Sequence, residues 1–238
     1  MAIKIIGKIW LLLAIVFIVW LWWSYRAQNV EAFLVSNDEV TVSDDQNAIQ
    51  FTPIKPYAKT LVFFPGALVD PRAYSPMCFR VAEHGYKAII VKMPFRLAQF
   101  GYNQTAVIYL FSDTTKKYYL SGHSKGGAMA ARFVYEKLAR ANGLILMGTT
   151  RPKDFDLSTL QIPVMKIYGD VDGVAKPEDV IANKNKLPAN TRFIAITGGN
   201  HSQFGWYGNQ FGDHKAGISR IKQQELILQY LLSMMINE

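Results

Sequence analysis

The chain has 238 residues, half of them hydrophobic, which excludes an intrinsically disordered protein and allows one folded core of good size. Its formal net charge is +8, and residues 28–238 keep 23 basic and 18 acidic side chains. No basic run or nucleic-acid motif accompanies this mild excess, which excludes a DNA or RNA role and suits an anionic membrane face or cell-surface polymer.

The first 27 residues predict a membrane anchor. A short basic stretch, residues 1–8, precedes residues 9–23, which are apolar and contain no charge, proline or glycine. A helix over residues 5–23 would be about 28 Å long, close to the thickness of a bilayer core. Three tryptophans at its end, Trp20, Trp22 and Trp23, would form an interfacial belt.

A cleaved signal peptide and a buried core helix are the alternatives. A signal peptidase prefers small residues, but the apolar run is followed by the bulky Tyr25 and Arg26. We therefore favour an uncleaved signal-anchor over residues 1–27. Because Lys4 and Lys8 outweigh Arg26, the positive-inside rule leaves the N-terminus in the cytoplasm. The chain is then a single-pass protein of the cell membrane, with residues 28–238 on the extracytoplasmic side.

The rest of the chain alternates short apolar runs with helix-like stretches, a pattern typical of a mostly parallel sheet covered by helices on both faces. We predict one α/β domain with eight strands and no inserted lid, and therefore a rather open site. The first two strands form an antiparallel pair. The predicted strands are 32–35, 48–51, 60–64, 88–92, 117–120, 144–147, 164–168 and 192–197, and the predicted helices are 74–84, 97–111, 125–141, 178–186 and 218–235.

The most informative motif is Gly122-His123-Ser124-Lys125-Gly126, which follows the strand at 117–120. It has the pattern of a nucleophile elbow, in which a strand turns sharply into a helix and the serine is exposed at the apex. The positive end of the helix dipole favours the negative charge that develops in acyl transfer. The pentapeptide alone is a modest signal, so the surrounding residues must support it.

A serine nucleophile needs a base and a carboxylate that orients the base, in the chain order Ser, acid, His for this kind of fold. Asp170 and Asp172 follow the strand at 164–168, and His201 follows the strand at 192–197. Both loops leave the same edge of a parallel sheet as the Ser124 turn, so these side chains can converge. Asp172 is favoured over Asp170 because it lies further out on the loop. His84, His123 and His214 are interpreted as ordinary packing or surface residues.

Two backbone N–H groups are the predicted donors to a reaction oxyanion. Lys125 follows the nucleophile, and Ala67 lies in the loop after the strand at 60–64, where Gly66 allows close approach to a substrate. An aromatic tract at 204–207, just beyond His201, either lines an acyl pocket, rests on the membrane or packs in the core. Cys78 is the only cysteine, so no internal disulfide can form and packing is its expected role. The histidines are scattered and no CxxC or HExxH pattern occurs, so we expect no metal.

With these motifs, residues 58–236 resemble the α/β-hydrolase superfamily, and specifically its compact branch of dienelactone hydrolases and small carboxylesterases. The resemblance also rests on the stretches 63–71 with Tyr74, 91–94, 167–172 and 199–201. It implies that Ser124 is the nucleophile, Asp172 the acid and His201 the base, with Ala67 and Lys125 as oxyanion donors. Pro65 stands where many relatives have histidine, and dienelactone hydrolases usually use cysteine in place of serine.

The predicted function is hydrolysis of a carboxylic ester, or of a thioester or amide, through an acyl-enzyme and without a cofactor. The substrate is a small-molecule or lipid-like ester. Two alternatives stay open: an acyltransferase that acts on a cell-surface acceptor, and a non-catalytic membrane-tethered binding protein on a hydrolase fold. The sequence does not fix the oligomeric state.

Overall fold

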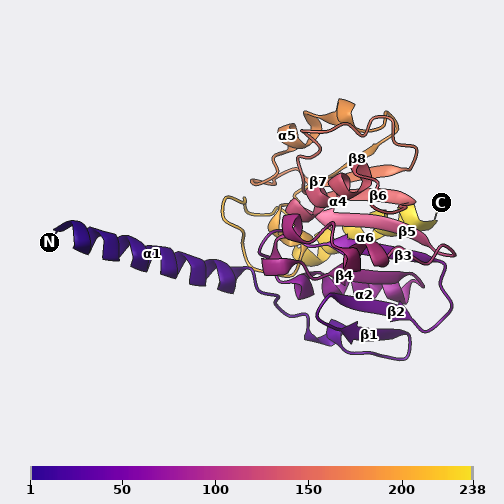
Figure 1. Ribbon diagram of the computed structural model, residues 1–238, viewed down its shortest axis with the longest axis horizontal. Coiled ribbons are helices and arrows are strands. Elements are labelled where there is room, and N and C mark those ends of the chain that lie inside the picture. The colour runs from indigo at the N-terminus through magenta and orange to yellow at the C-terminus, as the bar shows by residue number, and fades with distance from the viewer. Residues whose placement is uncertain (1, 237–238) are drawn as a thin grey trace.

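A single mixed sheet runs through the domain in the computed structural model, which describes residues 2–236 (Figure 1). Among residues 2–236 the sheet has eight strands, which lie in the order β1-β2-β4-β3-β5-β6-β7-β8. Strands β1 and β2 pair antiparallel, β2 pairs antiparallel with β4, and all other pairs are parallel. The strands are β1 (Val40–Asp44), β2 (Ala48–Pro53), β3 (Lys59–Phe64), β4 (Lys87–Val91), β5 (Lys117–His123), β6 (Gly143–Met147), β7 (Val164–Gly169) and β8 (Arg192–Ile196).

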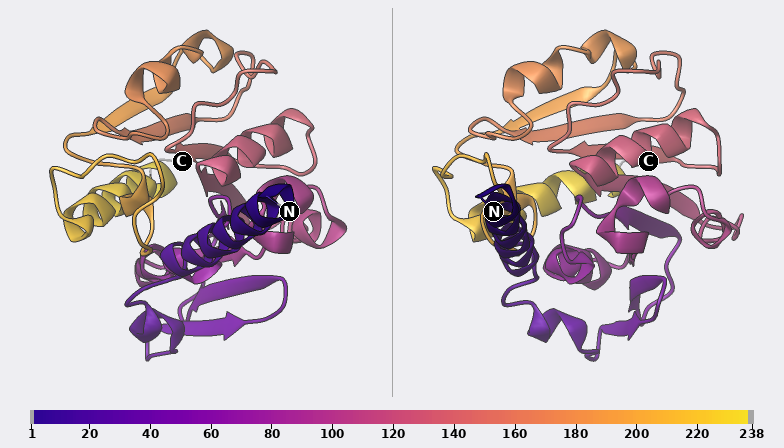
Figure 2. Two further views of the ribbon diagram at one scale, coloured as in Figure 1. Left: turned by 90° about the vertical axis from the view of Figure 1, so that its left-hand side faces the viewer. Right: turned by 60° about the vertical axis from the view of Figure 1, so that its left-hand side comes forward.

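Helices cover both faces of the sheet, because the central parallel strands are apolar on both sides. In β3, Leu61 and Phe63 pack under α2 and α6, whereas Val62 and Phe64 pack under α4 on the opposite face. Figure 2 shows these layers from two further directions. The α-helices are α1 (Ala2–Ser24), α2 (Ser75–Glu83), α3 (Thr105–Tyr109), α4 (Lys125–Tyr135), α5 (Pro177–Ile181) and α6 (Arg220–Ile236); the 3-10 helices are η1 (Glu31–Leu34), η2 (Pro71–Tyr74), η3 (Pro94–Arg96), η4 (Ala98–Phe100), η5 (Lys184–Lys186) and η6 (Ser202–Phe204).

The predicted α/β class, the eight strands and the antiparallel opening pair are confirmed, but the first strand is wrong. Residues 32–35 belong largely to η1, and β1 lies further along the chain. The Asn37 side chain accepts hydrogen bonds from the backbone N–H groups of Glu39 and Val40, and the turn that they form leads directly into β1. The edge strand is therefore a short, mostly exposed stretch with only Val40 fully buried, and it lacks the continuous apolar run by which the other strands were predicted.

The predicted helices are longer than those observed. The helix expected at 97–111 is broken into η4 and the short α3, because Gly101, with φ of −135° and ψ of −21°, is not helical. Only glycine fits there, since a Cβ would lie 2.6 Å from Pro94 Cδ. Helix α4 ends at Tyr135, and Lys137, with φ of 53°, cannot continue it, so the helix stops well before the expected residue 141. The helix expected at 178–186 is split into α5 and η5. In α6, Leu228 and Leu231 are buried as expected, but Ile221 is exposed and Gln223 is buried in its place.

Helix α1 projects from the domain, and its N-terminal end points away from it (Figure 1). Its window Ile6–Ser24 has a mean hydropathy of 2.1 and none of it is buried, so this helix is apolar enough to span a membrane. Immediately after it, Tyr25 is buried and packs edge-on against Tyr207. The buried core therefore begins at the first residue after the helix, without a linker.

Candidate active site

Ser124 lies between the end of β5 and the first residue of α4, in the sharp turn that the sequence predicts. Its φ of 53° and ψ of −119° are unusual for a residue with a side chain, and such strain is typical of functional turns. The flanking glycines are required by close packing. A Cβ on Gly122 would lie 2.6 Å from the Gly126 carbonyl carbon, and a Cβ on Gly126 would lie 2.1 Å from the Phe64 oxygen.

Asp172 and His201 form a hydrogen-bonded pair at the same edge of the sheet. Asp172 Oδ2 lies 2.8 Å from His201 Nδ1, and both side chains are fully buried. The other carboxylate oxygen, Oδ1, accepts hydrogen bonds from the backbone N–H groups of Val174 (2.8 Å) and Ala175 (2.6 Å). These bonds fix the carboxylate against the imidazole. Asp170, the competing candidate, instead accepts a hydrogen bond from the Gly198 N–H and does not contact the imidazole pair.

Ser124 and His201 line one pocket of about 190 Å³. His201 Nε2, the nitrogen that faces away from Asp172, is buried and has no hydrogen-bond partner within residues 2–236. An unpaired imidazole nitrogen in a pocket that a serine also lines is suited to accept the proton of the hydroxyl when the two groups come within hydrogen-bond distance. Two basic side chains, those of Lys125 and Arg151, also line the pocket. The complete lining consists of Ser124, Lys125, Ala128, Gly148, Thr149, Thr150, Arg151, Val174, Ala175 and His201.

The two predicted oxyanion donors lie on adjacent segments. Lys125 is the first residue of α4, and the loop that carries Ala67 packs directly against Gly126, because Gly126 approaches the carbonyl oxygens of Phe64 and Pro65. Neither the Ala67 nor the Lys125 backbone N–H has a hydrogen-bond partner in the described part of the chain, residues 2–236. Both groups are therefore free to bind a ligand oxygen, although Ala67 itself does not line the Ser124 pocket.

His123, interpreted from sequence as an ordinary packing residue, lies directly beside His201. The two ring centroids are 4.5 Å apart, and Phe204 stacks on the His123 ring at 5.1 Å. Its Nδ1 lies 2.9 Å from Tyr74 Oη, which also accepts a hydrogen bond from the Gly66 N–H. Burial first, and then the neighbouring His201, hold the pKa of His123 well below its usual value, so this ring is neutral at physiological pH. The signal in the sequence that could have placed His123 at the site was its position directly before Ser124 in the elbow motif.

Asp213 is a second residue that sequence reasoning missed. Its Oδ1 accepts hydrogen bonds from the backbone N–H groups of Gly173 (3.2 Å), His201 (3.2 Å) and His214 (2.9 Å). Oδ2 accepts from both the N–H (2.8 Å) and the hydroxyl (2.6 Å) of Ser202. One carboxylate thus joins the loop after β7 to the loop after β8. No motif marks this aspartate in the sequence.

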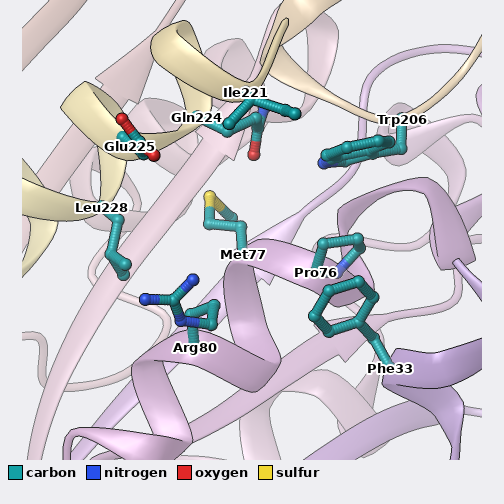
Figure 3. Close-up of a pocket in the computed structure, with 9 residues that line it drawn as sticks. All are labelled: Phe33, Pro76, Met77, Arg80, Trp206, Ile221, Gln224, Glu225 and Leu228. Atoms are coloured by element: carbon teal, nitrogen blue, oxygen red, sulfur yellow. The ribbon is translucent and has the colours of Figure 1, made fainter.

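The remaining candidates lie outside this constellation. Cys78 is buried in the core as expected, and burial raises the pKa of its thiol. In the aromatic tract, Phe204 and Tyr207 are buried, so packing is its main role. No group of three or more metal-ligating side chains occurs among residues 2–236. A separate cavity of about 100 Å³ between α2 and α6, lined by Met77, Trp206 and their neighbours, contains none of the predicted catalytic residues (Figure 3).

Comparison with known proteins shows the family and the fold of the chain. A family model described as "Alpha/beta hydrolase family" matches residues 60–225. Esterase 2 from Thermogutta terrifontis, solved after phosphoramylation by tabun, superposes with a TM-score of 0.57 at 16% identity and covers 83% of this chain and 96% of its own. An alpha-beta serine hydrolase homologue from Coxiella burnetii gives 0.56 at 15% identity, with 83% and 99% covered. Est1E from Butyrivibrio proteoclasticus, solved with ferulic acid, gives 0.58 at 12% identity, with 85% and 98% covered. No curated protein matches the chain.

Proposed function

Because the chain belongs to the α/β-hydrolase family, we propose that it is a serine hydrolase that cleaves carboxylic esters through an acyl-enzyme. The observation that carries this proposal is the Asp172–His201 hydrogen bond of 2.8 Å, with His201 Nε2 unpaired among the described residues in the pocket that Ser124 lines. The solved esterases of the same fold support this class of reaction, and the substrate of this chain is inferred from its own pocket.

In the proposed mechanism, His201 Nε2 accepts the Ser124 hydroxyl proton as the serine oxygen attacks the ester carbonyl carbon. The Asp172 carboxylate accepts the Nδ1–H hydrogen bond, so it keeps Nε2 directed toward the serine and stabilises the imidazolium. The imidazolium then protonates the leaving alcohol as the ester C–O bond breaks. Water, deprotonated by His201, attacks the acyl-enzyme, and the acid is released with Ser124 protonated again.

The Ala67 and Lys125 N–H groups would donate to the oxyanion of the tetrahedral intermediate. Lys125 is at the N-terminal end of α4, where the helix dipole adds to this stabilisation. Removal of one such donor typically slows catalysis about 10²- to 10³-fold, so the geometry of the loop after β3 matters as much as the triad. The Gly66–Tyr74–His123 hydrogen bonds hold that loop against the elbow.

Labelling with a fluorophosphonate probe tests the proposal, with p-nitrophenyl esters assayed in parallel on the full chain in detergent. Ser124→Ala should abolish labelling, and His201→Ala should lower ester turnover by about 10³-fold or more. Asp172→Asn should also lose most activity, whereas the matched variant Asp170→Asn should keep most of it. A folded protein that neither labels nor turns over esters would refute the proposal and favour the binding alternative.

We also infer that α1 is retained as a single-pass anchor, with the domain on the extracytoplasmic side. Retention is supported by Tyr25, which is buried in the core and which a cleavage at the end of the segment 1–27 would remove from the domain. A reporter fused after Glu238 tests the orientation: activity of an extracytoplasmic reporter is expected, and a cytoplasmic location would overturn it. The size of the membrane-bound protein, compared with the full chain, tests cleavage.

A further inference from the structure

The end of helix α1 is hydrogen-bonded to the domain. The Ser24 carbonyl accepts a hydrogen bond from the Gly208 N–H (2.8 Å), and the Tyr25 carbonyl accepts one from the Asp70 N–H (2.9 Å). Ser24 Oγ also donates to the Asn209 carbonyl at 2.8 Å. A Cβ on Gly208 would lie 2.6 Å from the Ser24 oxygen, so the helix end and this loop are in close contact. The direction of α1 therefore determines which side of the domain faces a membrane.

The side that meets α1 is the carboxyl edge of the parallel strands. Asp70 is in the loop after β3, which also carries Ala67, and Gly208 is in the segment after β8 that begins near His201. Ser124 lies at the end of β5, at the same edge. Figure 1 shows the helix leaving the domain beside the loop after β8. The proposed active site and the membrane-spanning helix thus share one side of the molecule.

Loops at this edge extend along the helix into its apolar part. Phe211 packs edge-on against Phe17 with ring centroids 6.4 Å apart, and Phe17 is seven residues, or about 10 Å, from the helix end. On the other side, an apolar groove of about 460 Å³ lies between α1 and the loops after β3 and β4. Its lining is Ile18, Leu21, Trp22, Leu68, Phe95 and Arg96.

These loop side chains are exposed although they are large and apolar. Phe95 is 83% exposed and Phe211 is 73% exposed. An exposed apolar patch beside a spanning helix marks a membrane contact, because lipid, and not water, surrounds the helix at that depth. If the window Ile6–Ser24 crosses the bilayer, side chains that contact Phe17 and Ile18 lie deeper in the bilayer than the C-terminal end of the helix.

Basic side chains border the same patch. Arg26, Arg72 and Arg96 line a pocket of about 590 Å³ next to the groove, together with Trp22. Asp70 pairs with Arg72 at 2.7 Å and with Arg96 at 3.3 Å, while Arg96 Nη1 has no hydrogen-bond partner within residues 2–236. Arginines at the level of the helix end match the anionic headgroups of a bilayer surface.

We propose that the carboxyl edge of the sheet rests on the bilayer that α1 spans, with Phe95 and Phe211 inserted among anionic lipids, and that the substrate is an amphiphilic ester taken from that bilayer. The substrate part rests on the proposed serine hydrolase function. The membrane is the occupant of the exposed patch because α1 and the patch are continuous. A substrate dissolved in the bilayer reaches Ser124 from the membrane side, without leaving the lipid surface.

A depth measurement tests the surface contact independently of activity. The full chain with Phe95→Cys or Phe211→Cys is labelled with an environment-sensitive fluorophore and reconstituted into vesicles of phosphatidylcholine and phosphatidylglycerol that contain spin-labelled lipid. The native Cys78 is buried and does not compete for the label. The control is Ile54→Cys, because Ile54 is 61% exposed and follows β2 at the opposite edge.

We expect blue-shifted emission and quenching by lipid spin labels at positions 95 and 211, and neither at position 54. Emission at 95 and 211 that matches position 54 would overturn the proposal. A blue shift without lipid quenching would also overturn it, because the patch would then be covered by protein, such as a second copy of the chain.

A rate comparison tests the substrate class. Phe95→Asn, which suits the φ of 54° at this position, and Phe211→Ser are combined in one variant, and Ile54→Ser is the matched control. Turnover of a long-chain ester held in the vesicles should fall about fivefold or more in the double variant, with turnover of a soluble acetyl ester unchanged. Equal turnover of the vesicle-held ester by the double variant and the wild type would overturn the substrate class. If the wild type cleaves neither ester while the depth measurement succeeds, the hydrolase proposal and the substrate class fail together, and the surface contact stands.

Discussion

Replacing Asp213 with alanine should loosen the site without altering a side chain of the proposed triad. The carboxylate accepts hydrogen bonds from Gly173, His201, Ser202 and His214, at distances from 2.6 to 3.2 Å. Hydrogen bonds to a charged group are each worth about 1.5–3 kcal/mol, but Asp213 is half-buried and water replaces part of them. We expect the free energy of unfolding to fall by about 2 kcal/mol.

Activity should fall more than stability suggests, since Asp213 fixes both loops that carry the Asp172–His201 pair. A displacement of about 1 Å in a catalytic group can cost about 10²-fold in rate, so kcat should fall about 10- to 100-fold with KM changed less than about threefold. Steady-state kinetics and urea unfolding measure the two effects. Asp113→Ala, in an exposed turn before β5, is the control and should change neither. A kcat for Asp213→Ala within about twofold of the wild type would refute this positioning role.

Three further outcomes are expected. Gly126→Ala should fail to label with a fluorophosphonate or fail to fold, because its Cβ would lie 2.1 Å from the Phe64 oxygen; normal labelling would contradict the close packing of the elbow. Burial lowers the pKa of Lys166 to about 8, so above pH 8 the unfolded state binds more protons than the folded state. Raising the pH from 7 to 9.5 should therefore add about 2 kcal/mol to the free energy of unfolding. Urea titrations measure this gain, and Lys166→Met should lack it. Burial lowers the pKa of His123, so below about pH 6.5 the unfolded state binds a proton that the folded state does not bind. Lowering the pH from 7 to 5 should therefore reduce the free energy of unfolding by up to about 2 kcal/mol. In His123→Phe this reduction should be smaller.

The central strands were predictable because they are buried on both faces. Strands β3 to β7 each consist largely of apolar residues, and their position in the chain matches the sequence prediction to within a few residues. The edge strand β1 was not predictable in this way, since its burial pattern is mostly exposed and a turn residue, Asn37, determines where it begins. Short helices with glycine or positive-φ breaks, such as the region around Gly101, were also overestimated by periodicity alone.

The chain order of Ser124, Asp172 and His201 predicts that they lie at one edge of the sheet, because parallel topology carries the ends of β5, β7 and β8 there. The choice of Asp172 over Asp170 rested on position in the loop, and Asp172 is the aspartate that forms a hydrogen bond with His201. What the sequence could not indicate is which residues support these loops. Asp213 bonds to Gly173 across 40 residues, and no local pattern encodes such a contact.

The same topology relates the apolar helix α1 to the proposed catalytic edge of the sheet. In a parallel sheet the loops at the carboxyl edge carry the reactive side chains, so an N-terminal helix that docks on those loops brings the site to the membrane, whereas docking at the opposite edge would direct it away. The contacts of Ser24 and Tyr25 with segments after β8 and β3 establish the first arrangement. Hydropathy alone predicts the helix, but only the position of its last residues relates the helix to Ser124.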